Sequence, residues 1–200
     1  MRESRDRALV VCEGGKTEPQ YLTDLVSSLG LGSADVRICG EECGSDPKSI
    51  YNFAIDMFSK DGDYDVVFCV FDRDKHSTFD WARTQILKTE LPNQKKIYCI
   101  YSIPCFEYWI MLHFVHTDSP ITEAGGKSAG QIAVSNAKRY IPKYRKAAVG
   151  VFQATKDRLP QAIKSSKIIL QASIQSGSEN PTTRMHELVE FLISMAKVQV

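Results

Sequence analysis

The chain has 200 residues, of which 43% are hydrophobic and 24% charged, and its formal net charge at pH 7 is +1. This length and apolar content suit one α/β domain with a packed core and room for a small appendage. No run of eighteen apolar residues occurs, and the charged first residues lack the apolar stretch of a secretory signal, so we expect neither a membrane span nor a leader.

The predicted strands and helices alternate through the first 115 residues. Short apolar runs rich in Val, Ile and aromatic residues predict strands over 9–12, 35–39, 64–71 and 96–102. Helices are expected between them, beginning near Thr17, Asp46 and Thr78. Thr17 with Gln20 fits a capping box, and the third helix is expected to turn Leu87 inward. Strict alternation gives right-handed crossovers, and therefore a four-stranded parallel sheet flanked by helices.

The remaining residues are predicted to be helical. Pro104 breaks the chain, and 106–114 is a very apolar candidate helix. Further helices are expected over 127–140, over 151–175 with a break at Pro160, and over 182–197. We therefore divide the chain into an α/β core over residues 1–115 and a helical, basic part over residues 116–200 that packs on the same domain.

Carboxylates follow three of the predicted strands. Glu13 ends the first, Asp72 and Asp74 end the third, and Glu107 follows the fourth after a turn. The carboxyl ends of parallel strands meet at one edge of a sheet, where ligands bind. Acids gathered there repel one another unless a cation neutralises them, and hard oxygen ligands suit Mg²⁺ or Mn²⁺. We predict metal-assisted phosphate chemistry; the plainer alternatives are polar loops and, for Glu107, a favourable charge at a helix start.

Two segments look like the end of a P-loop but fail its spacing. The pattern G-x-x-x-x-G-K-[ST] requires a glycine at position 10 for Gly15-Lys16-Thr17, where Val10 stands. Gly126-Lys127-Ser128 fails in the same way, because Ile121 occupies the required position. We reject P-loop nucleotide binding in both places.

The segment after the first strand is better interpreted as a tight turn into a helix. Gly14 and Gly15 allow positive φ and close approach of a phosphate, which Lys16 could neutralise. Glu18 lies in the first helical turn, where an acid is favoured by the helix dipole, so a structural role suits it equally well. An ordinary strand-to-helix turn remains the alternative.

The six cysteines and the histidines give no second catalytic site. No C-x-x-C pair occurs, and three of the cysteines lie inside apolar runs as small core residues, which fits a reducing cytoplasm. Cys105 has no apparent histidine partner for a nucleophilic role. His113 and His116 lack a third ligand and are better interpreted as core or partner contacts than as a zinc site.

The near-neutral charge hides an asymmetry. Residues 127–170 hold ten basic residues and one acid, whereas the rest of the chain holds 15 basic and 23 acidic residues. Basic clusters bind phosphate backbones through counterion release, and a solvated helical surface is the alternative. The candidate nucleic-acid-binding residues are Lys138, Arg139, Lys143, Arg145 and Lys146.

Several motifs, taken in order, resemble the RloB family. They are Glu13-Gly14-Gly15-Lys16-Thr17-Glu18-Pro19-x-Tyr21, residues 70–74, residues 102–109 with His113-Phe114, residues 140–146 and residues 180–183. The resemblance implies a Toprim-like fold with Mg²⁺ held by an acid after the first strand and a D-x-D after a later one, which Glu13, Asp72 and Asp74 match. Glu107 matches a further family motif. The resemblance also implies a bacterial restriction or phage-defence context and an ATPase companion.

Our hypothesis is a metal-dependent nuclease in phage defence, with Glu13, Asp72 and Asp74 as ligands, Lys16 on a phosphate and DNA or RNA as substrate. A non-catalytic Toprim-like partner of an ATPase is the first alternative. A strand-passing or primer-making enzyme is the second, although the chain lacks the extra domains that such reactions require. We expect a cytoplasmic protein without membrane partners, and a homo-oligomer is compatible with the sequence.

Overall fold

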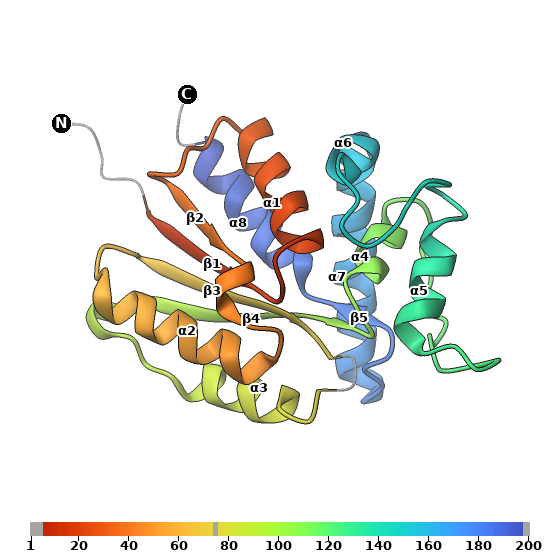
Figure 1. Cartoon of the computed structure of the whole chain (residues 1–200), viewed down its shortest axis with the longest axis horizontal. Coiled ribbons are helices and arrows are strands. Elements are labelled where there is room, and N and C mark those ends of the chain that lie inside the picture. The colour runs from red at the N-terminus through yellow and green to blue at the C-terminus, as the bar shows by residue number, and fades with distance from the viewer. Residues whose placement is uncertain (1–5, 74–75, 198–200) are drawn as a thin grey trace.

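The computed structural model describes residues 6–73 and 76–197 and centres on a five-stranded sheet with the order β2-β1-β3-β4-β5 (Figure 1). β1 (Ala8–Cys12), β2 (Val36–Cys39), β3 (Val66–Asp72) and β4 (Lys96–Ile103) are parallel. β5 (Thr182–Thr183) pairs antiparallel with the end of β4. The mixed α/β class is confirmed. The expected sheet of four parallel strands is wrong, because β5 adds a fifth strand that is antiparallel to β4. Two residues are too few to show the alternation that marks a strand.

Helices cover both faces of the sheet (Figure 1). α2 (Pro47–Lys60) and α3 (Phe79–Lys88) lie on one face, and α1 (Thr17–Ser28) and α8 (Met185–Lys197) on the other. Neighbouring β1 residues therefore enter different cores: Leu9 packs on the side of α2 and Val10 on the side of α1. Burial on both faces explains why these strands are nearly continuous apolar runs.

A group of helices stands beside the carboxyl ends of the strands (Figure 1). These are α4 (Glu107–Leu112), α5 (Ala129–Ala137), α6 (Val151–Thr155) and α7 (Leu159–Ser176). All of α4 is buried, and Trp109 is the largest of the fully buried side chains. The core around Trp109 draws on α1, α5, α6, α7 and α8, so residues from both parts of the chain share one core.

Three details differ from the sequence expectations. The expected helix over 151–175 is α6, a 3-10 turn at Lys156–Arg158 and α7, with Pro160 in the first turn of α7, where proline is tolerated. Leu87 is 71% exposed rather than inward, because the buried face of α3 is already complete with Phe79, Ala82 and Ile86. The Thr17 side chain makes no cap for α1 and instead accepts a hydrogen bond from the backbone N–H of Ala147 at 3.0 Å.

Two further 3-10 turns, Glu41–Cys43 and Pro92–Gln94, connect elements of the α/β core. α2 begins as predicted, since the Asp46 carboxylate accepts hydrogen bonds from the N–H groups of Lys48 and Ser49. All six cysteines fall within the described residues, and each is a buried free thiol. The sequence predicts burial for the three in apolar runs, Cys12, Cys69 and Cys99.

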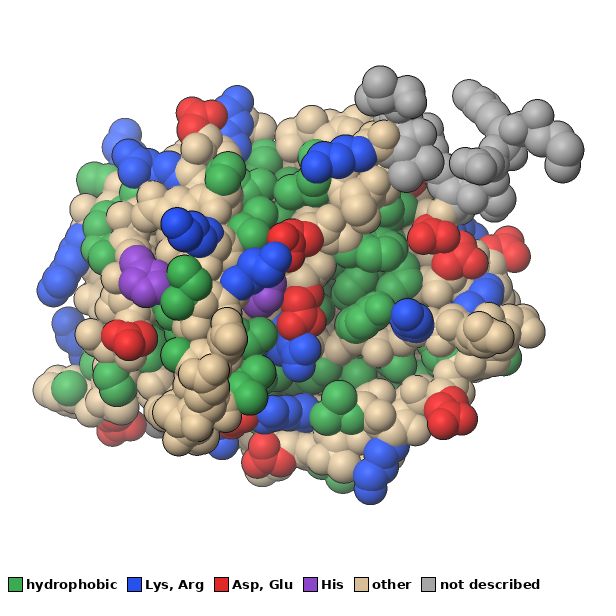
Figure 2. Space-filling view, turned by 180° about the vertical axis from the view of Figure 1, so that it is seen from behind, with side chains coloured by type: hydrophobic (Ala, Val, Ile, Leu, Met, Phe, Trp, Pro, Cys, Tyr) green, Lys and Arg blue, Asp and Glu red, His purple; other side chains and the backbone are tan. Residues whose placement is uncertain are grey.

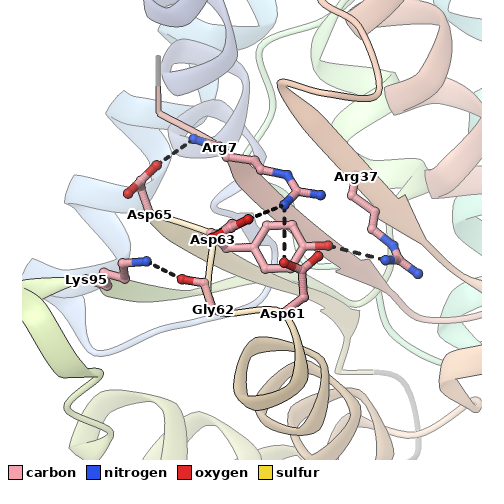
Figure 3. A network of polar contacts seen from close by, with 8 residues as sticks. Arg7, Arg37, Asp61, Gly62, Asp63, Asp65 and Lys95 are labelled. Carbon is pink, nitrogen blue, oxygen red and sulfur yellow. Dashed lines mark hydrogen bonds and ion pairs between the residues drawn. The ribbon is translucent and has the colours of Figure 1, made fainter. Parts of the chain in front are cut away.

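The amino ends of the strands carry a polar network centred on Arg7 (Figure 3). The backbone N–H of Arg7 donates to Asp65 Oδ2 at 2.8 Å, and its guanidinium lies 3.3 Å from Asp61 and 3.8 Å from Asp63. Lys95 donates to the Gly62 carbonyl at 2.6 Å. Asp61 and Asp63 at this edge therefore share a cationic partner.

Candidate active site at the carboxyl edge of the sheet

A cleft of about 320 Å³ opens where β1 and β3 end and α1 and α4 begin. The acids that line it are Glu13, Glu18, Glu41, Asp72 and Glu107, and the cations are Lys16 and Lys146. These residues come from five separate segments of the chain. The parallel topology brings them together, because each strand delivers its carboxyl end to this edge.

Glu13 is fixed directly after β1. Its backbone N–H continues the β1–β3 ladder to the Val70 carbonyl at 2.8 Å. Its carboxylate accepts a hydrogen bond from the backbone N–H of Asp72 at 3.0 Å, and the other oxygen lies 2.9 Å from His76 Nε2. The two residues therefore meet at the carboxyl edge, as the sequence predicts, through the backbone of Asp72, and their joint role as metal ligands stays a prediction.

Asp72 is the last residue of β3 and is only 9% exposed. Burial raises the pKa of its carboxyl well above the ordinary value, and the charges of Glu18, Glu107 and Glu13 raise it further. The backbone N–H of Phe106 opposes this rise. The carboxyl group therefore sits where negative charge is costly unless a cation enters.

Glu18, at the second position of α1, belongs to the same group. Burial is the main cause that raises its pKa to about 8; Glu107 and Glu13 add to the rise, whereas a backbone hydrogen bond and Lys146 oppose it. The sequence offered a helix-dipole role for Glu18 and did not include it in the site. The signal that could have placed Glu18 in the cleft is its position in the sequence, just after the Gly14-Gly15 turn that follows Glu13.

Glu107 opens α4 and is 1% exposed. The buried Tyr144 hydroxyl donates to Glu107 Oε1 at 2.9 Å. Burial opposes the charge on Lys146, but Glu107, Cys105, Asp72 and Glu18 together raise the pKa of its ammonium. Burial also raises the pKa of Cys105 well above the ordinary thiol value, which disfavours a thiolate nucleophile here.

The two turns that frame the cleft pack backbone against backbone. Gly14 has a φ of +67°, which favours glycine. A Cβ on Gly15 would lie 2.7 Å from Glu41 Cβ, and a Cβ on Gly40 would lie 2.8 Å from the Gly14 carbonyl oxygen. The glycines thus allow the turn after β1 to press against the turn after β2, and Lys16 is left exposed at the cleft.

The segment that carries Lys146 is held against α1. The N–H of Ala147 donates to Thr17 Oγ1, and Ala147 has a φ of +64°, an uncommon conformation for a residue with a side chain. The predicted nucleic-acid-binding residues are all exposed, but only Lys146 lines the cleft. On the face that Figure 2 shows, Lys and Arg side chains are scattered rather than gathered in one cluster.

The predicted metal ligands are described only in part. Asp74 lies outside the described residues, so the set of Glu13, Asp72 and Asp74 is not described as a whole. Within residues 6–73 and 76–197, no three His, Cys, Asp or Glu side chains are arranged to hold a metal ion. His113 is a core residue: its Nδ1–H donates to the Trp109 carbonyl at 3.0 Å, and its Nε2 lies 3.1 Å from the Tyr21 hydroxyl.

These observations define the class: a mixed α/β protein with a mostly parallel sheet and a carboxylate-lined cleft at the carboxyl edge. The family described as "RloB-like protein" matches residues 8–192, and the chain therefore belongs to the RloB-like family. Neither the curated proteins nor the solved structures gave a match. No helix in the described part of the chain has the length and apolar character needed to cross a membrane.

Proposed function

We propose that this protein is a metal-dependent nuclease that hydrolyses phosphodiester bonds in this cleft. The observation that carries the proposal is the convergence of Glu13, Glu18, Asp72 and Glu107, whose charges raise the pKa values of Asp72 and Glu18. Buried acids with shifted pKa values, gathered in a cleft, are typical of a functional site. At the amino edge of the same sheet, by contrast, Asp61 and Asp63 have the guanidinium of Arg7 as their partner, which is typical of a structural ion pair.

The donor set suits Mg²⁺ or Mn²⁺ in chemistry, since every candidate ligand is a carboxylate oxygen. Glu13, Asp72 and Asp74 would hold the ion. When bound, such an ion activates water for attack and stabilises charge on the transferring phosphate. Glu13 would have to exchange its contact with His76 for the ion, because His76 Nε2 lies 2.9 Å from one of its oxygens.

The other residues of the cleft would act on the substrate. Lys16 and Lys146 offer ammonium groups at its rim for the phosphate oxygens. Tyr144 holds Glu107 in one orientation, so that its carboxylate faces the cleft with Lys146. The basic side chains of Lys138, Arg139, Lys143 and Arg145 would contribute to attraction of the polyanion at longer range.

The Toprim-like character and the role in phage defence are part of the proposal. The parallel β1, β3 and β4 with acids after β1 and β3 support the Toprim-like relation, and membership of the RloB-like family supports the defence role. DNA and RNA are both candidate substrates, and an ATPase is the candidate companion.

The alternative function is a non-catalytic subunit that docks on a defence ATPase. Under that alternative the acids would serve only the fold. The mutual repulsion of these acids counts against the alternative. Paired charges, such as Arg7 and Asp61 at the amino edge, cost less free energy in a purely structural role.

The test is cleavage of labelled single- and double-stranded DNA and RNA by the full chain with Mn²⁺, Mg²⁺ or EDTA. Asp72→Asn keeps the shape of the side chain and removes its charge, and we expect it to abolish metal-dependent cleavage. Asp80→Asn, on the exposed side of α3, is the matched control and should cleave like the wild type. Co-purification with an ATPase and no cleavage under any condition would support the alternative.

A further inference from the structure

A second hollow, of about 360 Å³, adjoins the acid cleft along α5. Its polar lining is Lys127, Ser128, Gln131, Ser135 and Lys146. Lys146 also lines the acid cleft, so this residue borders both spaces. The lining of the second hollow includes no acid, whereas the first is lined by five. The charged lining is therefore mainly acidic on one side of Lys146 and wholly basic on the other.

Lys127 is presented to this hollow by a tight turn. The N–H groups of Ala124 and Lys127 each donate to the other residue's carbonyl, at 3.1 and 3.0 Å. Gly125 and Gly126, between them, have φ values of +57° and +73°, which is the pattern of a two-residue hairpin loop. The turn fixes the backbone of Lys127 directly before α5.

The start of α5 is occupied by its own cap. Ser128 Oγ accepts from the N–H of Gln131, and Gln131 Oε1 accepts from the N–H of Ser128 at 2.9 Å. These two backbone N–H groups are already hydrogen-bonded and would therefore not bind an anion. The attraction comes from the two ammonium groups of Lys127 and Lys146, with the hydroxyl of Ser128 beside them.

We propose that this hollow binds the backbone phosphate next to the one that is cleaved, so that Lys127 and Lys146 guide a single nucleic-acid strand out of the acid cleft. The inference rests on the proposed nuclease function and adds the path of its substrate. Gly126-Lys127-Ser128, which fails as a P-loop, acquires a role in phosphate binding without a nucleotide site. The path runs along α5 from its first turn and does not use Lys138 at the other end of that helix.

The experiment measures binding of fluorescein-labelled single-stranded DNA and RNA oligonucleotides to the full chain in EDTA, where the proposed hydrolysis cannot proceed. Dissociation constants are recorded over a series of salt concentrations. We expect Lys127→Ala to weaken binding several-fold and to lower the slope of log affinity against log salt by about 0.7, the loss of one phosphate contact on a single strand. Lys127→Arg should restore binding.

The control is Lys88→Ala, which removes the same charge from the exposed last turn of α3, away from both hollows, and should leave the slope unchanged. Equal effects of the Lys127 and Lys88 variants, or no binding by the wild type, would overturn the inference. Cleavage with Mn²⁺ is scored separately. A wild type that cleaves, with a Lys127→Ala variant that binds normally, defeats only the strand path. A wild type that binds through Lys127 but cleaves nothing defeats only the nuclease proposal.

Discussion

The backbone N–H of Asp72 donates to Glu13 Oε2 at 3.0 Å, so the last residue of β3 orients the acid that follows β1. This contact spans 59 positions of sequence and exists only because β1 and β3 are parallel neighbours. It places the Glu13 carboxylate against the end of β3, where the carboxyl group of Asp72 is buried. Acids held this close together repel one another, and this repulsion has consequences that can be measured.

Divalent cations should stabilise the fold. An ion that binds only the native acids at 100 times its dissociation constant adds about 2.7 kcal/mol, which raises the melting temperature of a 200-residue domain by roughly 5–10 °C. Differential scanning fluorimetry with Mn²⁺ measures the shift. Asp72→Asn should reduce it strongly, and an equal shift in that variant would remove Asp72 from the ion site.

Glu18→Gln should stabilise the protein in a pH-dependent way. The folded pKa of Glu18 is about 8, against an ordinary value of 4.5, so the unfolded chain releases this proton first as pH rises. The destabilisation by Glu18 is absent below pH 4.5, grows between pH 4.5 and 8, and levels off above pH 8. Urea titrations in EDTA should therefore show the advantage of Glu18→Gln growing over that window.

The matched control for this titration is Glu90→Gln, at an exposed position before β4. The same substitution there removes an exposed acid outside the cleft and should not reproduce the advantage of Glu18→Gln. An advantage of Glu18→Gln that does not vary between pH 4.5 and 8 would contradict the assignment of Glu18 to the acid group.

Tyr144→Phe should destabilise the fold by about 1–3 kcal/mol, because it leaves the buried Glu107 carboxylate without the donor that lies 2.9 Å from it. Urea denaturation measures the loss. Tyr140→Phe is the control: that ring stacks on Phe114 at the surface and is 38% exposed, so a change within about 0.5 kcal/mol is expected. Similar losses in both variants would show that Glu107 does not depend on Tyr144.

Glu179→Gln should affect cleavage more than stability. Glu179 accepts from Arg73 at 2.8 Å and from Arg83 at 2.5 Å, and Arg73 directly follows Asp72. Partly exposed ion pairs contribute at most about 1 kcal/mol, so the melting temperature should change little. Metal-dependent cleavage should fall, because the chain that follows Asp72 loses its anchor.

Glu190→Gln provides the comparison for Glu179→Gln. Glu190 pairs with Lys167 at 2.8 Å, between α8 and α7, and neither residue lines the acid cleft. Equal activities of the two variants would show that the Glu179 pair has no part in positioning Asp72.

Much of the α/β core could be predicted from the sequence. Buried parallel strands leave continuous apolar runs, and the Asp46-Pro47 cap marks the start of α2 without help from the rest of the chain. The meeting of Glu13 and Asp72 followed from the rule that parallel strands share a carboxyl edge. The nuclease activity, the metal and the partners stay predictions.

Other features depend on contacts that no local pattern encodes. Thr17 could satisfy either the start of α1 or the N–H of Ala147, 130 positions away, and the tertiary contact prevails. β5 forms only because Ser102 and Ile103 of β4 offer an edge to Thr183 and Thr182. Lys146 joins the acid cleft through the fold of residues 144–147, so a count of basic residues could not separate it from Lys143 or Arg145.

The core that surrounds Trp109 makes the carboxyl-terminal helices indispensable to the carboxyl edge of the sheet. A fragment that stopped near residue 115 would expose the apolar sides of α1 and α4 to water and would lose Tyr144, which holds Glu107. Under the proposed function, a change of substrate preference would therefore have to come from substitutions at the surface of α5, with the buried residues beneath it kept intact.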